Sequence, residues 1–319
     1  MESIKHSITK VECRVERLDK SRLKDLVKLH GAVYNSRLSP DYFGKKYDTA
    51  FTGVEDIGYI AYDRKGEPIA YYGVIPCFIE YHDEFVLAAQ SADTMTHPMH
   101  RYQGLFVELA ARTYDLCREK GILLVFGFPN QNSYKGLVDR LGWTVSENLY
   151  RFTIPLNSIP FEPLFEKYNW SQQIYSRFKR RALSRSETLD TGLANSVVKE
   201  GFAGVRRNGQ FFQYKTYSNT TVVKLASGKA WIKIKNGLDI GDMDVAEEDF
   251  KIAINSLKRL AIRIGVTQLS FQVSPSTKLY SCFAKEAEPI PSFPVGLKNL
   301  GANIPMEKIK FTLADLDIF

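Results

Sequence analysis

The chain has 319 residues, of which 44% are hydrophobic and 25% charged, and 43 Lys+Arg against 36 Asp+Glu give a formal net charge of +7. This composition is typical of a globular protein and excludes the disordered, collagen-like and membrane-embedded classes. The longest compact apolar run, residues 122–126, is too short to cross a bilayer, so we expect no membrane insertion. The positive excess is modest for this length, so a nucleic-acid partner ranks behind a small molecule.

The cysteines and the amino terminus predict a reducing, cytoplasmic setting. No Cys-x-x-Cys pair occurs, which argues against a disulfide framework and against a cysteine-based zinc site. Because the cysteines suggest no such site, we expect no metal cofactor. The first residues lack the apolar core of a signal peptide. The four widely spaced cysteines are Cys13, Cys77, Cys117 and Cys282.

The first half of the chain predicts a strand, a helix and an antiparallel meander. Apolar and charged residues alternate from 11 to 18, and an amphipathic helix follows over 23–33. Further on, turn-forming residues separate β-rich runs. These runs are 58–63, 69–79 and 85–94.

A helix, a buried strand and a shorter helix follow the meander. The long helix begins after Gly104 and ends at Gly121, and Pro129 ends the strand. The short helix covers 133–141, and a last strand passes through 150–154.

The second half repeats part of this order. After a junction, 221–225 and 229–234 form a hairpin, and a helix beginning near Ala246 ends at Gly265. A strand and Pro275 come next, so the order helix, Gly, strand, Pro, helix occurs twice. The pattern predicts an α/β (α+β) fold with a mixed, mainly antiparallel sheet flanked by helices and a degenerate internal duplication.

A basic aromatic segment, 175–181, lies in the junction. Its charges are interpreted either as a solvated helix face or as a contact to phosphate or RNA.

The pattern Arg101-x-x-Gly104 lies between the last meander strand and the long helix. Backbone N–H groups in the first turn of a helix lack intrahelical acceptors, and the positive end of the helix dipole favours an anion there. Glycine lets the backbone approach a phosphate closely. The pattern in this context predicts a diphosphate-binding loop.

The run from Thr96 to Phe106, together with the meander before it and the helix, strand, Pro129-Asn130, short helix and Gly142-Trp143 after it, resembles the GNAT superfamily of acyl-CoA N-acyltransferases. The resemblance covers roughly residues 10–155. It implies a first GNAT domain at 1–158, a helical junction at 159–199 and a degenerate GNAT-like domain at 200–319, where residues 239–248 contain no phosphate loop.

The resemblance implies acetyl-CoA, or another acyl-CoA, as co-substrate. Backbone N–H groups near Met95 and Thr96 are expected to polarise the thioester carbonyl, and Asn130 and Asn132 to hold the pantetheine amides; turn formation is the alternative for the asparagines. Phe106 stands where the family usually has Gly or Ala, and its side chain is expected on the apolar face of the helix. The residues expected to bind the cofactor are Met95, Thr96, Arg101, Tyr102, Gln103, Gly104, Leu105, Phe106, Asn130 and Asn132.

Asp93 and Tyr134 are the candidate catalytic residues. Asp93, at the end of the last meander strand, is the candidate base. Alternatively, Asp93 orders the loop through hydrogen bonds to the backbone. In that case solvent or the carboxylate of Phe319 is the base. Val138 occupies the position at which many relatives carry a Tyr acid. Tyr134, one helical turn earlier, is the substitute, unless it only packs against the cleft wall.

These observations predict an N-acyltransferase that moves an acetyl or other short acyl group from acyl-CoA to a primary amine, such as an amino sugar. One alternative is a tRNA-dependent aminoacyl transferase of the peptidoglycan-bridge type, with RNA contacted by residues 177–185. A non-catalytic module that binds acyl-CoA or nucleic acid is the other.

Overall fold

The computed structural model describes residues 12–36, 38–161, 165, 169–235 and 237–319. Residue 11 and parts of the expected junction therefore lie outside the described residues. The chain forms two compact units that interleave in sequence, whereas contiguous domains at 1–158 and 200–319 were expected. Unit 1 takes its described residues from 1–78, 86–145 and 295–303, and unit 2 from 79–85, 146–294 and 304–319.

The sheet of unit 1 contains the expected meander. Its strands pair antiparallel in the order β1-β2-β3-β4, β5 then pairs parallel with β4, and the end of β12 pairs antiparallel with β5. The strands are β1 (Arg14–Arg17), β2 (Gly58–Tyr62), β3 (Pro68–Tyr81), β4 (Glu84–Thr96), β5 (Leu124–Gly127) and β12 (Ile290–Asn299).

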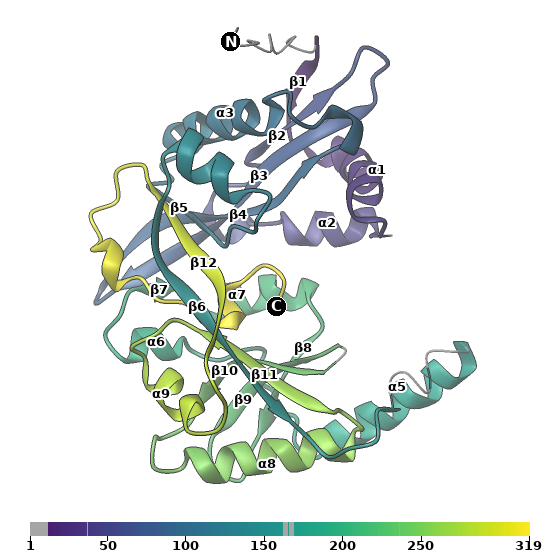
Figure 1. Cartoon of the computed structure of the whole chain (residues 1–319), viewed down its shortest axis with the longest axis vertical. Coiled ribbons are helices and arrows are strands. Elements are labelled where there is room, and N and C mark those ends of the chain that lie inside the picture. The colour runs from purple at the N-terminus through teal and green to yellow at the C-terminus, as the bar shows by residue number, and fades with distance from the viewer. Residues whose placement is uncertain (1–11, 37, 162–164, 166–168, 236) are drawn as a thin grey trace, which may run out of the picture. The chain divides into compact units, whose positions relative to one another are not determined.

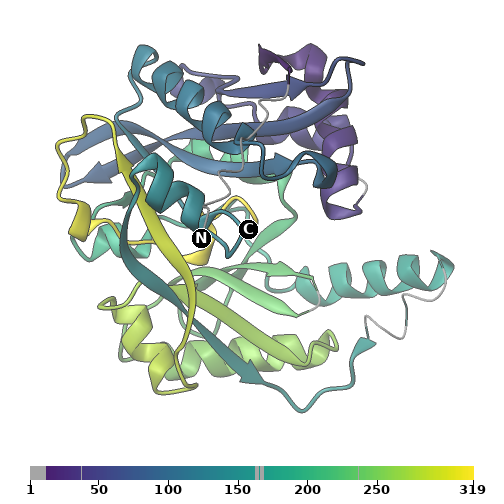
Figure 2. The same ribbon diagram turned by 45° about the horizontal axis from the view of Figure 1, so that its top comes forward.

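Helices cover both faces of this sheet (Figures 1 and 2). Neighbouring residues of a strand face opposite ways. Tyr72 therefore meets Tyr114 of α3 on one face, and Tyr71 meets Tyr47, at the end of α2, on the other. The helices are α1 (Leu23–Tyr34), α2 (Pro40–Lys46) and α3 (Leu105–Glu119), with short 3-10 turns at Lys20–Arg22, Ala50–Thr52 and Pro98–His100.

The sheet of unit 2 has the strand order β6-β11-β10-β9-β8. Its pairs are antiparallel except for the parallel pair β10–β11. The expected hairpin is β8–β9, closed by Gly228 at φ 78°. The strands are β6 (Thr144–Pro155), β8 (Thr220–Lys224), β9 (Lys229–Ile234), β10 (Leu238–Asp244) and β11 (Gln268–Val273); the two-residue strand β7 (Gly204–Val205) lies outside this order and pairs with residues 79–80 of β3.

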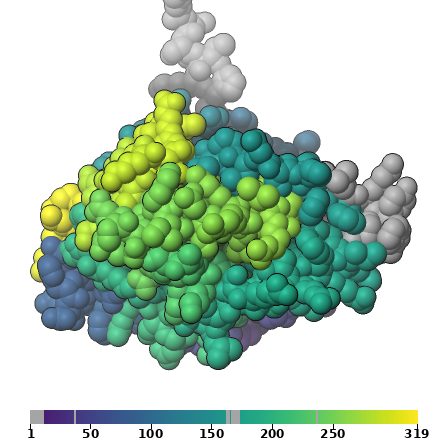
Figure 3. All heavy atoms as spheres, turned by 90° about the horizontal axis from the view of Figure 1, so that it is seen from below, coloured from purple at the N-terminus to yellow at the C-terminus, as the bar shows by residue number. Residues whose placement is uncertain are grey.

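The apolar face of the unit 2 sheet packs against α8, whose outer surface is seen in green in Figure 3. The basic aromatic segment lies in α5, where Tyr175 is buried and donates a 3.0 Å hydrogen bond to the carbonyl of Ile264, whereas Arg177 and Arg181 are exposed. The helices are α5 (Asn169–Leu183), α6 (Ser196–Lys199), α7 (Gly209–Tyr214), α8 (Phe250–Arg263) and α9 (Lys278–Ala284), with 3-10 turns at Lys215–Tyr217, Met306–Lys308 and Leu313–Asp315.

The order of elements repeats in the two units as the sequence indicated. In each unit an antiparallel meander, a long helix, a glycine with positive φ (Gly121 at 75°, Gly265 at 71°) and a parallel strand follow one another. The last strands are exchanged, because β6 pairs with β11 of unit 2 and the end of β12 pairs with β5 of unit 1. This exchange explains why the units interleave. That a duplication produced the repeat stays a prediction.

Candidate functional site

In unit 1, the parallel strands β4 and β5 part before β4 ends. Their last paired residues are Gln90 and Phe126, whereas β4 continues to Thr96. Residues 91–96 of β4 therefore have no partner in β5. Their backbone N–H and C=O groups that face this side lie beyond the paired part of the two strands. Met95 and Thr96, the residues expected to polarise a carbonyl, lie in this stretch, and the side chain of Met95 is buried.

The loop after β4 presents unpaired N–H groups at the start of α3. At the start of the helix, the N–H of Glu108 donates to the carbonyl of Gly104 at 3.1 Å. Within the described chain, the N–H groups of Leu105, Phe106 and Val107 have no protein acceptor. Gly104 adopts φ 79°, and a Cβ there would meet no atom within 4 Å. The loop thus offers an accessible, electropositive cluster of donors.

The side chains of the loop divide into exposed and buried ones. Tyr102 is 97% exposed, and the exposed Arg101 forms no ion pair with any described residue. Leu105 is buried and anchors the helix. The amide oxygen of Gln103 is buried and has no hydrogen-bond partner among the described residues. A cation and a set of backbone donors are therefore available for a ligand at this loop.

Phe106 lies on the apolar face of α3, as expected. Its ring is 5.8 Å from that of Tyr72, and a Cβ built on Gly136 would come within 2.3 Å of it. The bulky side chain is accommodated because Gly136 has none. A glycine within an apparent helix was the sequence signal for this contact.

A chain of hydrogen bonds that the sequence analysis missed begins where β4 and β5 part. Ser91 donates to the hydroxyl of Tyr72 at 2.9 Å, that hydroxyl lies 2.8 Å from the hydroxyl of Tyr114, and the indole of Trp143 donates to Tyr114 at 2.9 Å. Burial raises the pKa of Tyr72 and of Tyr114, so both hydroxyls stay protonated. The chain orders this part of unit 1.

Asp93 forms an ion pair with Lys46, which the sequence did not indicate. The Lys46 ammonium lies 2.9 and 2.8 Å from the two carboxylate oxygens, and the Tyr47 hydroxyl donates to Asp93 at 2.9 Å. The side chains of Lys46 and Asp93 are only 3% and 14% exposed. Burial and the nearby Asp93 charge raise the pKa of Tyr47. Asp93 also has φ 49°, which lies in the left-handed region. These contacts therefore hold an irregular residue of the strand β4.

The asparagine segment forms a turn. The side-chain oxygen of Asn130 accepts from the N–H groups of Asn132 at 2.9 Å and Ser133 at 3.2 Å. This supports the turn-forming alternative for that oxygen. Both asparagines are exposed.

The expected short helix over 133–141 is present over residues 134–141, and its part Gly136–Arg140 is π-helical. A π-helix closes i→i+5 hydrogen bonds, here from the N–H of Leu141 to the carbonyl of Gly136. Tyr134 and Val138 are therefore not related by a regular α-helical turn. Tyr134 is 39% exposed, which argues against a role limited to wall packing.

The described residues of unit 2 contain no equivalent of the loop. Where β10 and β11 part, after Ile240 and Phe271, the segment 311–319 of the same chain lies beside the strands. The N–H of Ser274 donates to the carbonyl of Phe311 at 2.9 Å, and the Phe319 ring covers Gly241. Four acidic residues precede α8 in the sequence, at the position where a diphosphate would need cations. They are Asp244, Glu247, Glu248 and Asp249.

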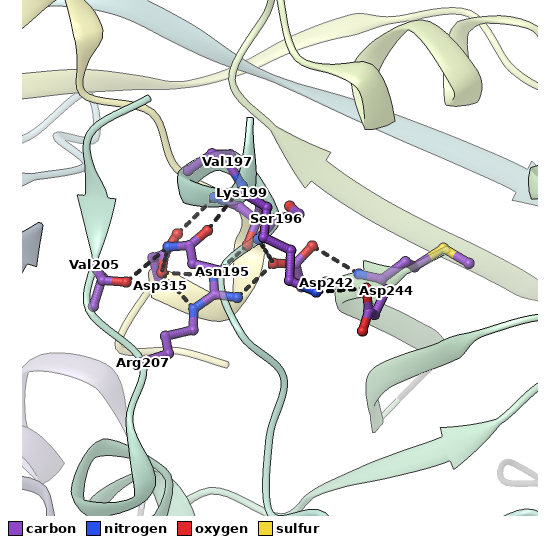
Figure 4. A network of polar contacts seen from close by, with 11 residues as sticks. Asn195, Ser196, Val197, Lys199, Val205, Arg207, Asp242, Asp244 and Asp315 are labelled. Atoms are coloured by element: carbon purple, nitrogen blue, oxygen red, sulfur yellow. Dashed lines mark hydrogen bonds and ion pairs between the residues drawn. The ribbon is translucent and has the colours of Figure 1, made fainter. Parts of the chain in front are cut away.

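A buried ionic network holds this terminal segment (Figure 4). Arg207 donates to Asp242 at 2.6 Å, to Asp315 at 2.7 Å and to Thr312 at 2.7 Å. Arg207 and both aspartates have fully buried side chains. Burial opposes the charge of Arg207, but the two carboxylates offset it and raise the pKa of the guanidinium.

Two general properties complete the description. No helix among the described residues is long and apolar enough to cross a membrane. In the same residues, no three His, Cys, Asp or Glu side chains are grouped to hold a metal ion, and Cys13, Cys77, Cys117 and Cys282 are free thiols.

Comparisons with known proteins agree with this architecture. Residues 14–146 match the family model of the acetyltransferase (GNAT) domain. No curated protein matches the sequence. The structure resembles a GCN5-related N-acetyltransferase from Kribbella flavida, with TM-score 0.55 and 13% identity over 91% of this chain and 72% of that one. It also resembles one from Anabaena variabilis, with TM-score 0.56 and 11% identity over 91% and 73%.

At such low identity these solved structures show a shared fold, and the family model identifies the domain that carries the loop. Residues 14–146 of this chain therefore form a domain that matches the acetyltransferase (GNAT) family.

Proposed function

We propose that this protein transfers an acetyl or other short acyl group from acyl-CoA to a primary amine, with an amino sugar as the favoured acceptor. The observation that carries the proposal is the set of unpaired N–H groups from Leu105 to Val107, beside the cation of Arg101 and within the GNAT domain. Charge-assisted hydrogen bonds to an anion are about twice as strong as neutral ones. The diphosphate of coenzyme A suits this cluster.

The remaining cofactor contacts are proposed from their position. The backbone of Met95 and Thr96, beyond the last β4–β5 pair, is available to polarise the thioester carbonyl. Tyr102, Gln103 and the first residues of α3 flank the diphosphate. The side-chain NH₂ groups of Asn130 and Asn132 are exposed and suit the pantetheine amides, although the oxygen of Asn130 is used in the turn.

In the reaction, the amine nitrogen attacks the thioester carbonyl carbon and the carbon–sulfur bond breaks. The proton of the amine passes to a base, and the departing thiolate receives a proton from an acid. We assign Tyr134 as the acid because this residue is 39% exposed and its hydroxyl makes no hydrogen bond to any described residue. Asp93 remains the candidate base. Its ion pair with Lys46 supports the alternative role, in which Asp93 positions the end of β4.

Product analysis tests the proposed function. The full chain is incubated with acetyl-CoA and a pooled library of primary amines that includes amino sugars, and products are identified by mass spectrometry. We expect at least one N-acetylated amine and release of stoichiometric free thiol. The Gly104→Glu variant should form little product.

A parallel incubation uses charged tRNA in place of acetyl-CoA. Aminoacyl transfer from tRNA without turnover of acetyl-CoA would favour the tRNA-dependent transferase. Binding of acetyl-CoA without turnover of any amine would favour the non-catalytic module.

Replacing Tyr134 by Phe should lower kcat about 10²-fold while the affinity for coenzyme A stays unchanged, because positioned proton transfer contributes roughly 10²- to 10⁴-fold. Steady-state kinetics and calorimetry measure the two quantities. The control is Tyr81→Phe, which removes a half-buried tyrosine hydroxyl outside the proposed site. Equal kcat in the Tyr134 and Tyr81 variants would remove Tyr134 from the mechanism.

A further inference from the structure

The face of the unit 2 sheet opposite α8 carries polar side chains in register. Antiparallel and parallel pairing place Lys233 beside Asp239, Asp239 beside Ser270, and Ser270 beside Thr153. Directly paired residues on one face have neighbouring side chains. A polar row therefore crosses β9, β10, β11 and β6.

A second pair on the same face adds a guanidinium. Arg151 of β6 is directly paired with Gln272 of β11, and the Gln272 amide oxygen accepts a 2.7 Å hydrogen bond from Ser292. Lys235, just beyond the end of β9, adds another cation. These residues line a cavity of about 240 Å³. Its other walls include Leu313, Ile318 and Phe319.

The lining is electropositive, with three cationic side chains and the carboxylate of Asp239. Asp239 accepts a hydrogen bond from Ser270, and the Lys233 ammonium donates to Ser218 at 2.9 Å and to the carbonyl of Ile318 at 2.6 Å. In contrast, Arg151 and Lys235 form no ion pair with any residue of the described chain. Two positive charges thus border the cavity without an ion-pair partner among the described residues, and the three cations outnumber the single carboxylate side chain, Asp239.

Hydrogen bonds hold the terminal segment, residues 311–319, which forms one wall of the cavity. The buried ammonium of Lys215 donates to the carbonyl of Leu316 at 2.5 Å, and the Tyr217 hydroxyl donates to that of Asp317 at 3.0 Å. Asp315 is held by Arg207 (Figure 4). A site whose walls are ordered before binding loses less entropy when a ligand enters.

We propose that unit 2 binds a small oxyanion, a phosphate or carboxylate group, in this cavity through Arg151 and Lys235. Guanidinium groups recognise both anions through paired N–H donors. Gln272 and Thr153 supply polar groups that orient the rest of the ligand. The cavity is smaller than the roughly 300–1,000 Å³ typical of drug-sized ligands, so the ligand is a compact metabolite. This site does not depend on the proposed transferase activity.

Calorimetry on the full chain tests the proposal with three probes: inorganic phosphate, glucose 6-phosphate and succinate. We expect saturable binding of at least one probe, weakened about 10-fold or more in the double variant Arg151→Gln, Lys235→Gln. The phosphate probes and succinate distinguish the two oxyanions. The matched control is Arg259→Gln, which removes an exposed arginine of α8 on the other side of the sheet.

Phosphate could also bind at the loop of unit 1, so the same titrations are made with Gly104→Glu. Binding that survives in Gly104→Glu and is lost in the double variant supports the site. Absence of saturable binding for all three probes at millimolar concentration overturns the proposal. Unchanged affinity in the double variant, or loss only in Gly104→Glu, overturns it as well.

Discussion

Gly104→Glu is expected to lower the affinity for coenzyme A on the order of 10²-fold. Gly104 has φ 79°, a conformation that costs other residues about 1–2 kcal/mol, and it precedes the unpaired N–H groups of α3. A carboxylate at this point repels the diphosphate, and each charge-assisted bond that is lost contributes roughly 1.5–3 kcal/mol. Because a Cβ at Gly104 meets open space, the variant should fold.

The control is Gly121→Glu at the other end of the same helix. Gly121 has φ 75° and an equally open environment, and it lies roughly 22 Å away along α3. It should bind coenzyme A as the parent protein does. Calorimetry of the parent should give one coenzyme A per chain, because segment 311–319 and the carboxylates before α8 occupy the corresponding region of unit 2. Two bound molecules, or unchanged affinity in Gly104→Glu, would contradict the assignment.

Asp93→Asn should lower kcat by a factor on the order of 10² to 10⁴ if Asp93 is the general base, with little change in coenzyme A affinity. The same change leaves the buried Lys46 ammonium without a counter-charge, so the free energy of unfolding should also fall. Kinetics from about pH 6 to 9 separate the two roles. Loss of the low-pH limb of the kcat profile, where a general base becomes protonated, indicates a base, whereas a lowered rate with that limb intact indicates positioning.

Unit 2 provides the matched control. Asp242 also lies in the last meander strand, at an irregularity of the pairing, and it forms a buried ion pair with Arg207. Asp242→Asn should lower the free energy of unfolding by about 3 kcal/mol, measured by denaturant titration, and leave kcat unchanged. If Asp93→Asn keeps a rate within a few-fold of the parent across this pH range, Asp93 has no catalytic role.

Local patterns in the sequence predicted many of the helices and strands and the free N–H groups of the loop, but not α2, α7, β10 or β12. Alternation of period two predicted β1, β-rich runs separated by turn-forming residues predicted β2 to β4, and an apolar stripe with glycine at both ends predicted α3. Arg101-x-x-Gly104 indicated the diphosphate loop, because helix termini lack partners whatever the rest of the fold. These features depend on residues within a few positions of one another.

The tertiary structure decided what depends on distant residues. Asp93 meets Lys46 across 47 positions, and Arg207 meets Asp315 across 108. Pairing of β6 with β11 and of β12 with β5 is chosen by register over long separations, and no local pattern encodes the partner. The Phe106 ring lies against Gly136, which begins the π-helical turn, and this contact joins residues 30 positions apart. Local sequence patterns therefore predicted many of the helices and strands, while side-chain packing and strand exchange determined which charged groups meet.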